Sequence, residues 1–407
     1  MPRPSTPPRL LDETAVYIRA LCSSCGLTQS GPKTLLVQRL RHAARRHKPL
    51  TSSSRILSID LGLKNFAFCL LSPARSTKEN KNHSMGALLN TPVHLHAWNR
   101  LDLTAAVQSF GARSSPLRPE PSSSPLEDII AETQPSKKDQ QEDTLPDDMF
   151  SPARLSLVTA HLVRTLLLPL RPTHVLIERQ RFRTGGNAAV SEWTLRVGAL
   201  EAMIHATLGT YRDILKDNQA LSTAGSGKGL PTAQGSVTGG ESALSLAAGL
   251  ESVSSVVPKQ VAAYVFPVAG ENTASAVEED VDGEGDETKK KKKISTYAAL
   301  KKEKINMLGS LLAPEAGMVT PVTKQAEEMI EGYLGGWEWR KMSRKEKAKK
   351  RKDGEVGENE EKWTQEKLDD LSDAVLQGLV WLQWQRNLEE IVRDWPELTE
   401  GQDTTDV

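Results

Sequence analysis

Two short apolar runs on either side of a glycine-containing turn constrain the fold of this 407-residue chain more than any other feature. The first run covers 56–59 and ends in Asp60, and the second covers 66–71, after a turn at 61–65. This pattern predicts two paired strands joined by a tight connection. Alternating apolar residues over 93–101 predict a third strand.

Later segments predict a fourth strand and several helices. An apolar run over 173–178 has the character of a buried strand. The first three strands can form a meander, whereas the fourth must reach the sheet through a crossover. The chain is therefore predicted to be α/β, with a mixed sheet flanked by helices. Helices are expected over 152–168, 188–208, 294–312 and 366–387, and a further ordered segment over 256–265.

The composition indicates that these ordered segments alternate with long inserts. Apolar residues make up 38% of the chain and charged residues 26%, whereas typical domains are about 45–50% apolar. Stretches rich in Ser, Pro, Gly or charge are predicted to be disordered. They lie near 112–150, 217–251, 268–288 and 340–361, and an acidic tail is expected over 389–407.

Cysteine content and hydropathy exclude several classes of protein. Three cysteines cannot form a disulfide framework. No run of about 18 apolar residues exists, so no membrane span is expected, and no apolar stretch follows Met1 to suggest secretion. Cys22 and Cys25 lack a second metal-ligand pair, so we interpret them as helix-turn packing rather than zinc ligands.

The N-terminal region has the charge expected of a nucleic-acid-binding module. The chain as a whole has no net charge, with 52 basic and 52 acidic residues, but residues 1–59 carry ten basic and two acidic residues. Residues 10–48 are predicted to form two helices joined by a glycine-containing turn. This helical module precedes a main domain that is expected over 55–388. The second helix has one apolar and one basic face. Its candidate DNA contacts are Lys33, Arg39 and Arg41.

Acidic residues stand where strands and helices do not ordinarily need them. Asp60 and Glu178 each close an apolar strand, and Asp369, Asp370 and Asp373 fall within an arc of about 100° on one predicted helix. Crowded carboxylates raise one another's pKa unless a cation neutralises them, and hard oxygen ligands select Mg²⁺, with Mn²⁺ able to substitute. Two such ions can activate a water and stabilise a leaving oxygen in phosphodiester hydrolysis.

Each acid also has an ordinary structural explanation. Asp60 is in a position typical of turn or cap residues, and Glu178 has Arg179 or Arg181 nearby as an ion-pair partner. Asp369 and Asp370 stand near a helix start, where acids compensate the helix dipole. The case for a site therefore rests on the set rather than on any one member.

Three motifs follow one another along the chain: SIDLGLKN over 58–65, IERQRFR over 177–183 and DDLSDAVLQG over 369–378. Together they resemble the mitochondrial Holliday junction resolvases of fungi, in the RuvC-like branch of the RNase H-like superfamily. Residues 21–40 resemble the SAP-type helix–turn–helix at the start of those proteins. The resemblance implies an RNase H-like core in a homodimer that resolves four-way DNA junctions by paired symmetric nicks, in mitochondrial DNA recombination and segregation.

The same resemblance assigns roles to particular residues. It carries over Asp60, Glu178 and Asp373 as catalytic, metal-binding acids. The fourth acid is Asp370 by i, i+3 spacing to Asp373 or Asp369 by i, i+4 spacing, and we slightly favour Asp370. Further candidate DNA contacts are Lys64, Arg179, Arg181 and Arg183.

The expected partners are four-way junction DNA and a second copy of the chain, with neither a membrane nor a small-molecule substrate. Two alternative functions remain. One is a different RNase H-like nuclease that acts on flaps or RNA–DNA hybrids. The other is a non-catalytic, DNA-binding architectural protein.

Overall fold

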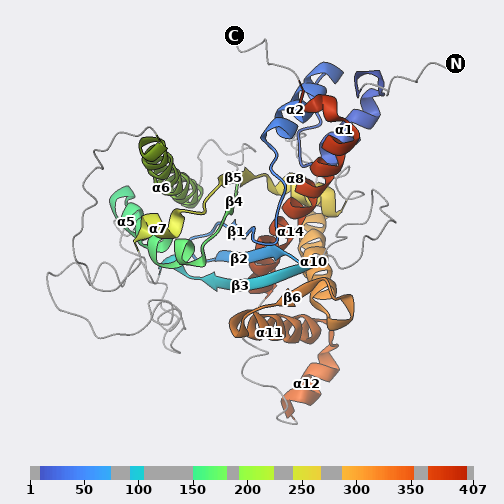
Figure 1. Ribbon diagram of the computed structural model, residues 1–407. Coiled ribbons are helices and arrows are strands. Elements are labelled where there is room, and N and C mark those ends of the chain that lie inside the picture. The colour runs from blue at the N-terminus through green and yellow to red at the C-terminus, as the bar shows by residue number, and fades with distance from the viewer. Residues whose placement is uncertain are drawn as a thin grey trace, which may run out of the picture.

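The computed structural model describes residues 10–74, 92–104, 150–180, 192–223, 242–266, 287–352 and 365–400 (Figure 1). The strands are β1 (Ile56–Asp60), β2 (Phe66–Pro73), β3 (Val93–Leu101), β4 (His174–Glu178), β5 (Ser252–Val256) and β6 (Val319–Pro321). The helices are α1 (Ala15–Ser24), α2 (Lys33–Arg46), α5 (Pro152–Leu162), α6 (Glu192–Thr223), α7 (Ala243–Ala247), α8 (Pro258–Val265), α10 (Glu287–Leu312), α11 (Lys324–Lys341), α12 (Arg344–Lys352) and α14 (Gln365–Asp394).

The six strands form one mixed sheet in the order β5-β4-β1-β2-β3-β6. β1, β2 and β3 pair antiparallel in sequence, whereas β4 pairs parallel with β1 and β5 pairs parallel with β4. The predicted meander and crossover are thereby confirmed. The α/β class with a mixed sheet flanked by helices is confirmed as well.

Alternating side chains of the central strands supply two separate cores. Ile59, Phe68 and Ile177 face α5, α6 and α7, whereas Cys69 and Leu176 face α10, α11 and α14. Figure 1 shows these two helical layers on opposite sides of the sheet. A central strand covered on both faces has to be apolar throughout, which accounts for the continuous apolar runs in β1 and β4.

By length and composition alone, Pro152–Leu170 would suffice to cross a membrane, the one such segment among the described residues. The buried side chains on this segment, which include Val158, Leu162 and Leu166, pack into the core on one face of the sheet. The segment therefore serves here as a core element.

The two N-terminal helices share a core with the C-terminal end of α14. Leu21 and Leu40 pack with Leu388 and Ile391, and the side-chain amide of Asn387 donates a hydrogen bond to the Ser24 carbonyl. In Figure 1, α1 and α2 accordingly lie against the end of α14. Residues 389–398 thus belong to this core, in contrast to the acidic tail expected over 389–407.

Some expected inserts contain regular structure. α6 runs on to Thr223 and α7 forms over Ala243–Ala247, both inside the stretch 217–251 that was expected to be a linker. α12 forms within the expected charged insert 340–361. Residues 105–149 and 267–286, which cover most of the other two expected inserts, lie outside the described residues.

Candidate active site

The site is built on the carboxyl ends of two adjacent parallel strands. Ile59 pairs with Ile177, so Asp60 on β1 and Glu178 on β4 follow at the same edge of the sheet. Asp60 also pairs with Ala67 on β2, which pairs with Arg100 on β3. Side chains in one row across a sheet point to the same face. The two acids and the arginine therefore all face the layer that contains α14.

Helix α14 lies unusually close to β1 because of two residues. A Cβ atom at Gly378 would come within 2.7 Å of Leu71 Cδ1 and 3.2 Å of Ser58 Cβ, so only glycine allows this approach. The amide of Gln377 donates hydrogen bonds to Ser58 Oγ at 3.1 Å and to the Ile59 carbonyl at 3.2 Å. These contacts fix the helix beside Asp60 and bring Asp373, one turn earlier, to the strand ends.

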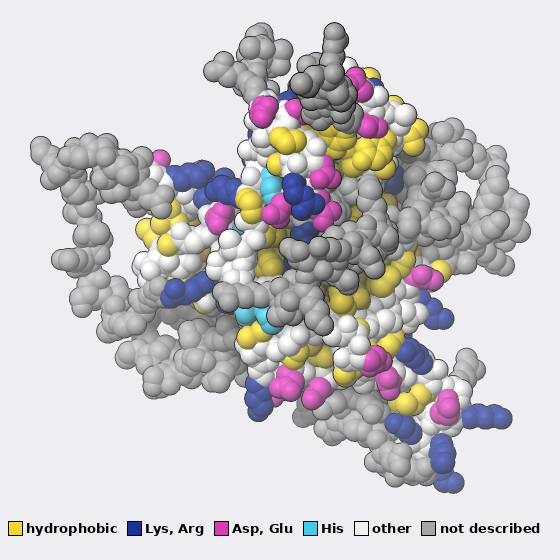
Figure 2. Space-filling model, turned by 45° about the vertical axis from the view of Figure 1, so that its right-hand side comes forward, with side chains coloured by type: hydrophobic (Ala, Val, Ile, Leu, Met, Phe, Trp, Pro, Cys, Tyr) yellow, Lys and Arg dark blue, Asp and Glu magenta, His cyan; other side chains and the backbone are white. Residues whose placement is uncertain are grey.

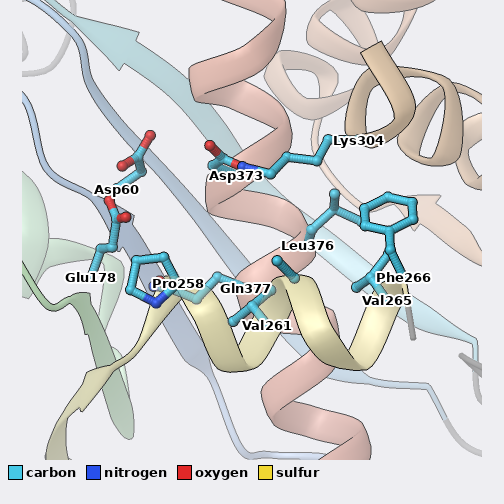
Figure 3. A pocket seen from close by; sticks show the side chains of 11 residues that line it. Asp60, Glu178, Pro258, Val261, Val265, Phe266, Lys304, Asp373, Leu376 and Gln377 are labelled. Carbon is cyan, nitrogen blue, oxygen red and sulfur yellow. The ribbon is translucent and has the colours of Figure 1, made fainter. Parts of the chain in front are cut away.

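Asp60, Glu178 and Asp373 line one pocket, together with Lys304 from α10 (Figure 3). In Figure 3 the carboxylates of Asp60 and Glu178 lie next to each other, and Asp373 faces them from across the pocket. The cavity measures about 30 Å³, which is room for about two water-sized species. The remaining lining includes apolar side chains of α8 such as Val261 and Val265, which limit access of bulk water.

Burial and the crowding of the carboxylates together raise the pKa of Asp60. Burial, followed by the charge of Glu178 and a hydrogen bond shared with it, raises the pKa of Asp60 well above its usual value. The nearby charges of Asp373 and Asp370 act in the same direction. Such a group binds either a proton or a cation more readily than an isolated carboxylate does.

Asp373 is held by a lysine from the neighbouring helix. Lys304 Nζ lies 2.7 Å from Asp373 Oδ1, and the two side chains are 21% and 31% exposed. Burial raises the pKa of Asp373 to about 7 even though the Lys304 charge lowers it. Burial acts to lower the pKa of Lys304, but the charge of Asp373 and their hydrogen bond outweigh it and raise that pKa. Lys304 is therefore a fixed positive charge at the edge of the pocket.

Asp369 and Asp370, the other two candidate acids on α14, have separate basic partners and are not among the residues that line the pocket. Asp370 Oδ2 lies 2.9 Å from Arg100 Nε, and burial raises its pKa to about 6 against the effect of that arginine. Asp369 Oδ2 lies 2.6 Å from Lys301 Nζ. The other carboxylate oxygen, Asp369 Oδ1, is buried and has no hydrogen-bond partner among the described residues.

In the part of the chain that the structure describes, no three Asp, Glu, His or Cys side chains converge closely enough to enclose a metal ion. The predicted acids therefore meet in one region, but the two lysines and Arg100 hold the α14 carboxylates apart from the pair at the strand ends. Sequence reasoning missed Arg100 altogether. Its position in the row with Asp60 follows only from the strand register.

The candidate DNA contacts are spread over several elements. Lys64 is exposed in the β1–β2 turn, with its Nζ 6.0 Å from the centre of the Trp193 ring. Arg179 is exposed directly after Glu178, whereas Arg181 and Arg183 lie outside the described residues. Arg39 on α2 donates to the backbone carbonyl of Thr28 at 2.9 Å and so supports the turn between α1 and α2. Lys33 and Arg41, also on α2, are half-buried.

The raised pKa of Asp373 predicts that the metal-free protein loses stability with rising pH. Between the ordinary value of 3.8 and about 7, the folded protein binds a proton at Asp373 that the unfolded chain does not. The free energy of unfolding therefore falls across this range and levels off above it. Denaturation in EDTA at several pH values measures the slope, and Asp373→Asn is expected to make it less steep. An identical slope in that variant would contradict the assignment.

Comparisons with known proteins agree with the motifs. Residues 56–391 match the family model described as mitochondrial resolvase Ydc2 / RNA splicing MRS1. The chain is 28% identical over 190 residues to the mitochondrial cruciform cutting endonuclease 1 of Schizosaccharomyces pombe. That alignment covers 47% of this chain and 53% of the relative, so the chain spans about half the length of the curated relative it matches. The crystal structure of the yeast mitochondrial Holliday junction resolvase Ydc2 aligns with a TM-score of 0.45 at 19% identity, covering 94% of this chain and 98% of that one.

Proposed function

Because this chain belongs to the family of the mitochondrial resolvase Ydc2 and the RNA-splicing protein MRS1, we propose that it is a structure-selective endonuclease that resolves four-way DNA junctions. One observation carries the proposal. Carboxylates from β1, β4 and α14, which are far apart in the sequence, line a single small pocket with raised pKa values at Asp60 and Asp373. A protein that only binds nucleic acid has no need for such crowding.

The chemistry of these side chains suits a divalent cation, although in the described part of the chain the three carboxylates lie too far apart to enclose one without moving closer. The donor set is entirely carboxylate oxygen, which suits Mg²⁺ or Mn²⁺. Asp60 and Glu178 repel each other without a counter-charge, and Asp369 Oδ1 is a buried acceptor that lacks a donor in the part of the chain that the structure describes. We infer that Asp60, Glu178 and Asp373 hold the ion, which supplies Lewis-acid activation of water and of the scissile phosphate when bound.

The remaining polar residues position these ligands. Lys304 and Lys301 neutralise Asp373 and Asp369 from α10, which allows acidic side chains to lie together at low exposure. Arg100 holds Asp370 from β3. The apolar side chains of α8 narrow the pocket and so strengthen the electrostatic interactions inside it.

A cleavage comparison tests the function. The full chain is incubated with Mg²⁺ and a synthetic four-way junction, a flapped duplex or an RNA–DNA hybrid of related sequence. Paired nicks at symmetric positions of the junction, with little cleavage of the other two, are expected. Preferred cleavage of the hybrid or flap would assign the chain to another nuclease activity. Tight junction binding without any nicking would assign it a binding role only.

Asp369 and Asp370 are distinguished by their surroundings. We propose Asp369 as the fourth ligand, in place of the slight preference for Asp370 from spacing, because one of its carboxylate oxygens is buried without a hydrogen-bond partner among the described residues, while Lys301 holds the other. Asp369→Asn is expected to weaken Mg²⁺ binding and junction cleavage by about 10–100-fold, and Asp370→Asn by less. Titration of Mg²⁺ by calorimetry, beside cleavage rates, makes the comparison. A larger effect at Asp370 would restore the first assignment.

Three further features belong to the same proposal. The curated relative and the solved structure are both named as mitochondrial, which supports a mitochondrial location for this chain. Symmetric cleavage needs two active sites, which supports a homodimer. The helical module over 10–48, with its basic face on α2, supports a SAP-like role in DNA binding.

A further inference from the structure

Helix α12 is a short, strongly basic helix that none of the motifs above includes. Residues 341–352 contain eight basic residues and one acidic residue. The exception, Glu346, forms a capping box with Ser343: Ser343 N donates to Glu346 Oε2 at 2.6 Å, and Glu346 N donates to Ser343 Oγ at 3.3 Å. The only acid of the helix is therefore used to start it, and it neutralises none of the following lysines.

The lysines of α12 divide into an inner and an outer set. Lys347 is half-buried: its Nζ lies 5.8 Å from the centre of the Trp339 ring and donates to the Arg340 carbonyl at 3.4 Å. Lys345, Lys349 and Lys352 are exposed, and their i, i+4, i+7 spacing places them on one face. Within the described ranges these three side chains form no ion pair. The outer face is thus a row of positive charge that no acidic side chain of the described residues pairs with.

Helix α11, which directly precedes α12, is held in a fixed place relative to the proposed catalytic acids. Trp337 of α11 packs over Gly309 of α10, where a Cβ atom would lie 2.3 Å from the indole ring. Tyr333 Oη, one turn earlier in α11, lies 2.7 Å from Ser372 Oγ, next to Asp373. From Tyr333 to the start of α12 the chain covers about 23 Å at most. That distance is less than one turn of duplex DNA, about 34 Å.

From these contacts we propose that the outer face of α12 binds the phosphate backbone of a duplex arm that leaves the active site. The three lysines span about 10 Å of helix, which matches about three phosphates of one strand at 3.4 Å of axis each. Figure 2 shows Lys and Arg side chains gathered at the lower end of the molecule, where Figure 1 places α12. The inference rests on the proposed nuclease function and adds a second DNA-contacting element to the basic face of α2.

An anionic membrane is a poorer match for this helix. Helices that lie on membranes have an apolar face that inserts between the lipids. The sole apolar residue of α12 is Ala348. A lysine row without an apolar face is suited to phosphates that stay hydrated, as on the DNA backbone.

The test compares two double variants of the full chain. Lys345→Gln/Lys349→Gln removes two charges from the outer face. Lys216→Gln/Lys324→Gln removes two lysines that are 64% and 88% exposed, on α6 and α11, and serves as the charge-matched control. Binding to a four-way junction and to a plain duplex is measured in EDTA over a range of salt concentrations, so that cleavage does not interfere. Thermal unfolding verifies that both variants fold.

The outer-face variant is expected to bind the junction about tenfold more weakly at moderate salt, and its plot of log K against log salt should be less steep by about 1.8, the value for two lost phosphate contacts. The control is expected to keep the wild-type slope.

Equal slopes in both variants, in a protein that cleaves the junction normally, would overturn the role of α12 alone. If the wild-type protein does not cleave junctions but the outer-face variant still lowers the slope on duplex DNA, the nuclease proposal fails and the role of α12 stands. Loss of binding to phosphatidylserine vesicles without any change on DNA would overturn it in favour of a membrane surface.

Discussion

Asp373→Asn is expected to lower the rate of Mg²⁺-dependent junction cleavage by at least about a hundredfold, which is the upper end of the effect of losing a mere outer-shell partner of a metal ligand. Asparagine keeps the shape of the side chain and still accepts a hydrogen bond from Lys304, but it removes the charge that faces Asp60 and Glu178 across the pocket. Cleavage rates at saturating protein measure the effect. Chelation of the metal with EDTA should lower the wild-type cleavage rate by at least the same factor as the Asp373→Asn substitution does.

The control for this variant lies on the same helix. Asp394→Asn removes an exposed carboxylate that pairs only with Arg393, at 3.7 Å among the described residues. It should cleave at the wild-type rate. Junction binding in EDTA should be similar in both variants, since neither side chain is proposed to contact DNA directly. Cleavage by Asp373→Asn at the wild-type rate would remove this residue from the site.

Gly26→Ala is expected to lower the free energy of unfolding by about 2–5 kcal/mol, the sum of a left-handed backbone cost and an overpacking cost. Gly26 has a φ of +67°, and a Cβ atom there would lie 2.3 Å from the Trp384 ring. The substitution therefore strains the turn after α1 and pushes the N-terminal helices away from α14. Denaturant-induced unfolding, monitored by circular dichroism, measures the loss.

Gly317→Ala separates the two costs. Gly317 has a φ of +58°, but a Cβ atom there meets no other atom within 4 Å. This variant bears the backbone cost alone, about 1–2 kcal/mol. The excess loss in Gly26→Ala then measures how tightly the N-terminal module is docked. Equal losses at the two positions would mean that the module is not held against Trp384.

Three of the four strands that the sequence predicted have side chains that are apolar on both faces, and the fourth, β3, was predicted from alternating apolar residues. β1, β2 and β4 have this pattern, and their boundaries follow from it closely. β5, with the sequence SVSSV, was missed because its residues are largely polar and half-buried. It forms because the backbone of β4 offers a free parallel edge, which is a property of the assembled sheet. The capping box formed by Ser343 and Glu346 is a local sequence signal for the start of α12. The run of lysines that follows it nevertheless led to a prediction of disorder for this segment.

The carboxylate cluster was predictable for a similar reason. Acids at the carboxyl ends of parallel strands must meet at one edge, so Asp60 and Glu178 follow from strand positions alone. The partners of the α14 acids did not follow. Whether Arg100 reaches Asp370 or Asp369 depends on a register that spans three strands and on the depth to which Gly378 lets the helix approach. A helical arc of about 100° cannot distinguish two neighbouring acids within it.

Helix α14 runs without interruption from Asp373, a proposed metal ligand, to the docked N-terminal helices. From Asp373 to Trp384 the helix rises about 16 Å, and each residue inserted between them would rotate one end against the other by about 100°. The orientation of the basic face of α2 relative to the proposed cleavage site therefore depends on the number of α14 residues that lie between them. Length changes in this protein are tolerable in the connections between elements, where its long inserts lie. Inside α14 a single added residue would turn the basic face of α2, which we propose to bind DNA, away from the proposed cleavage site.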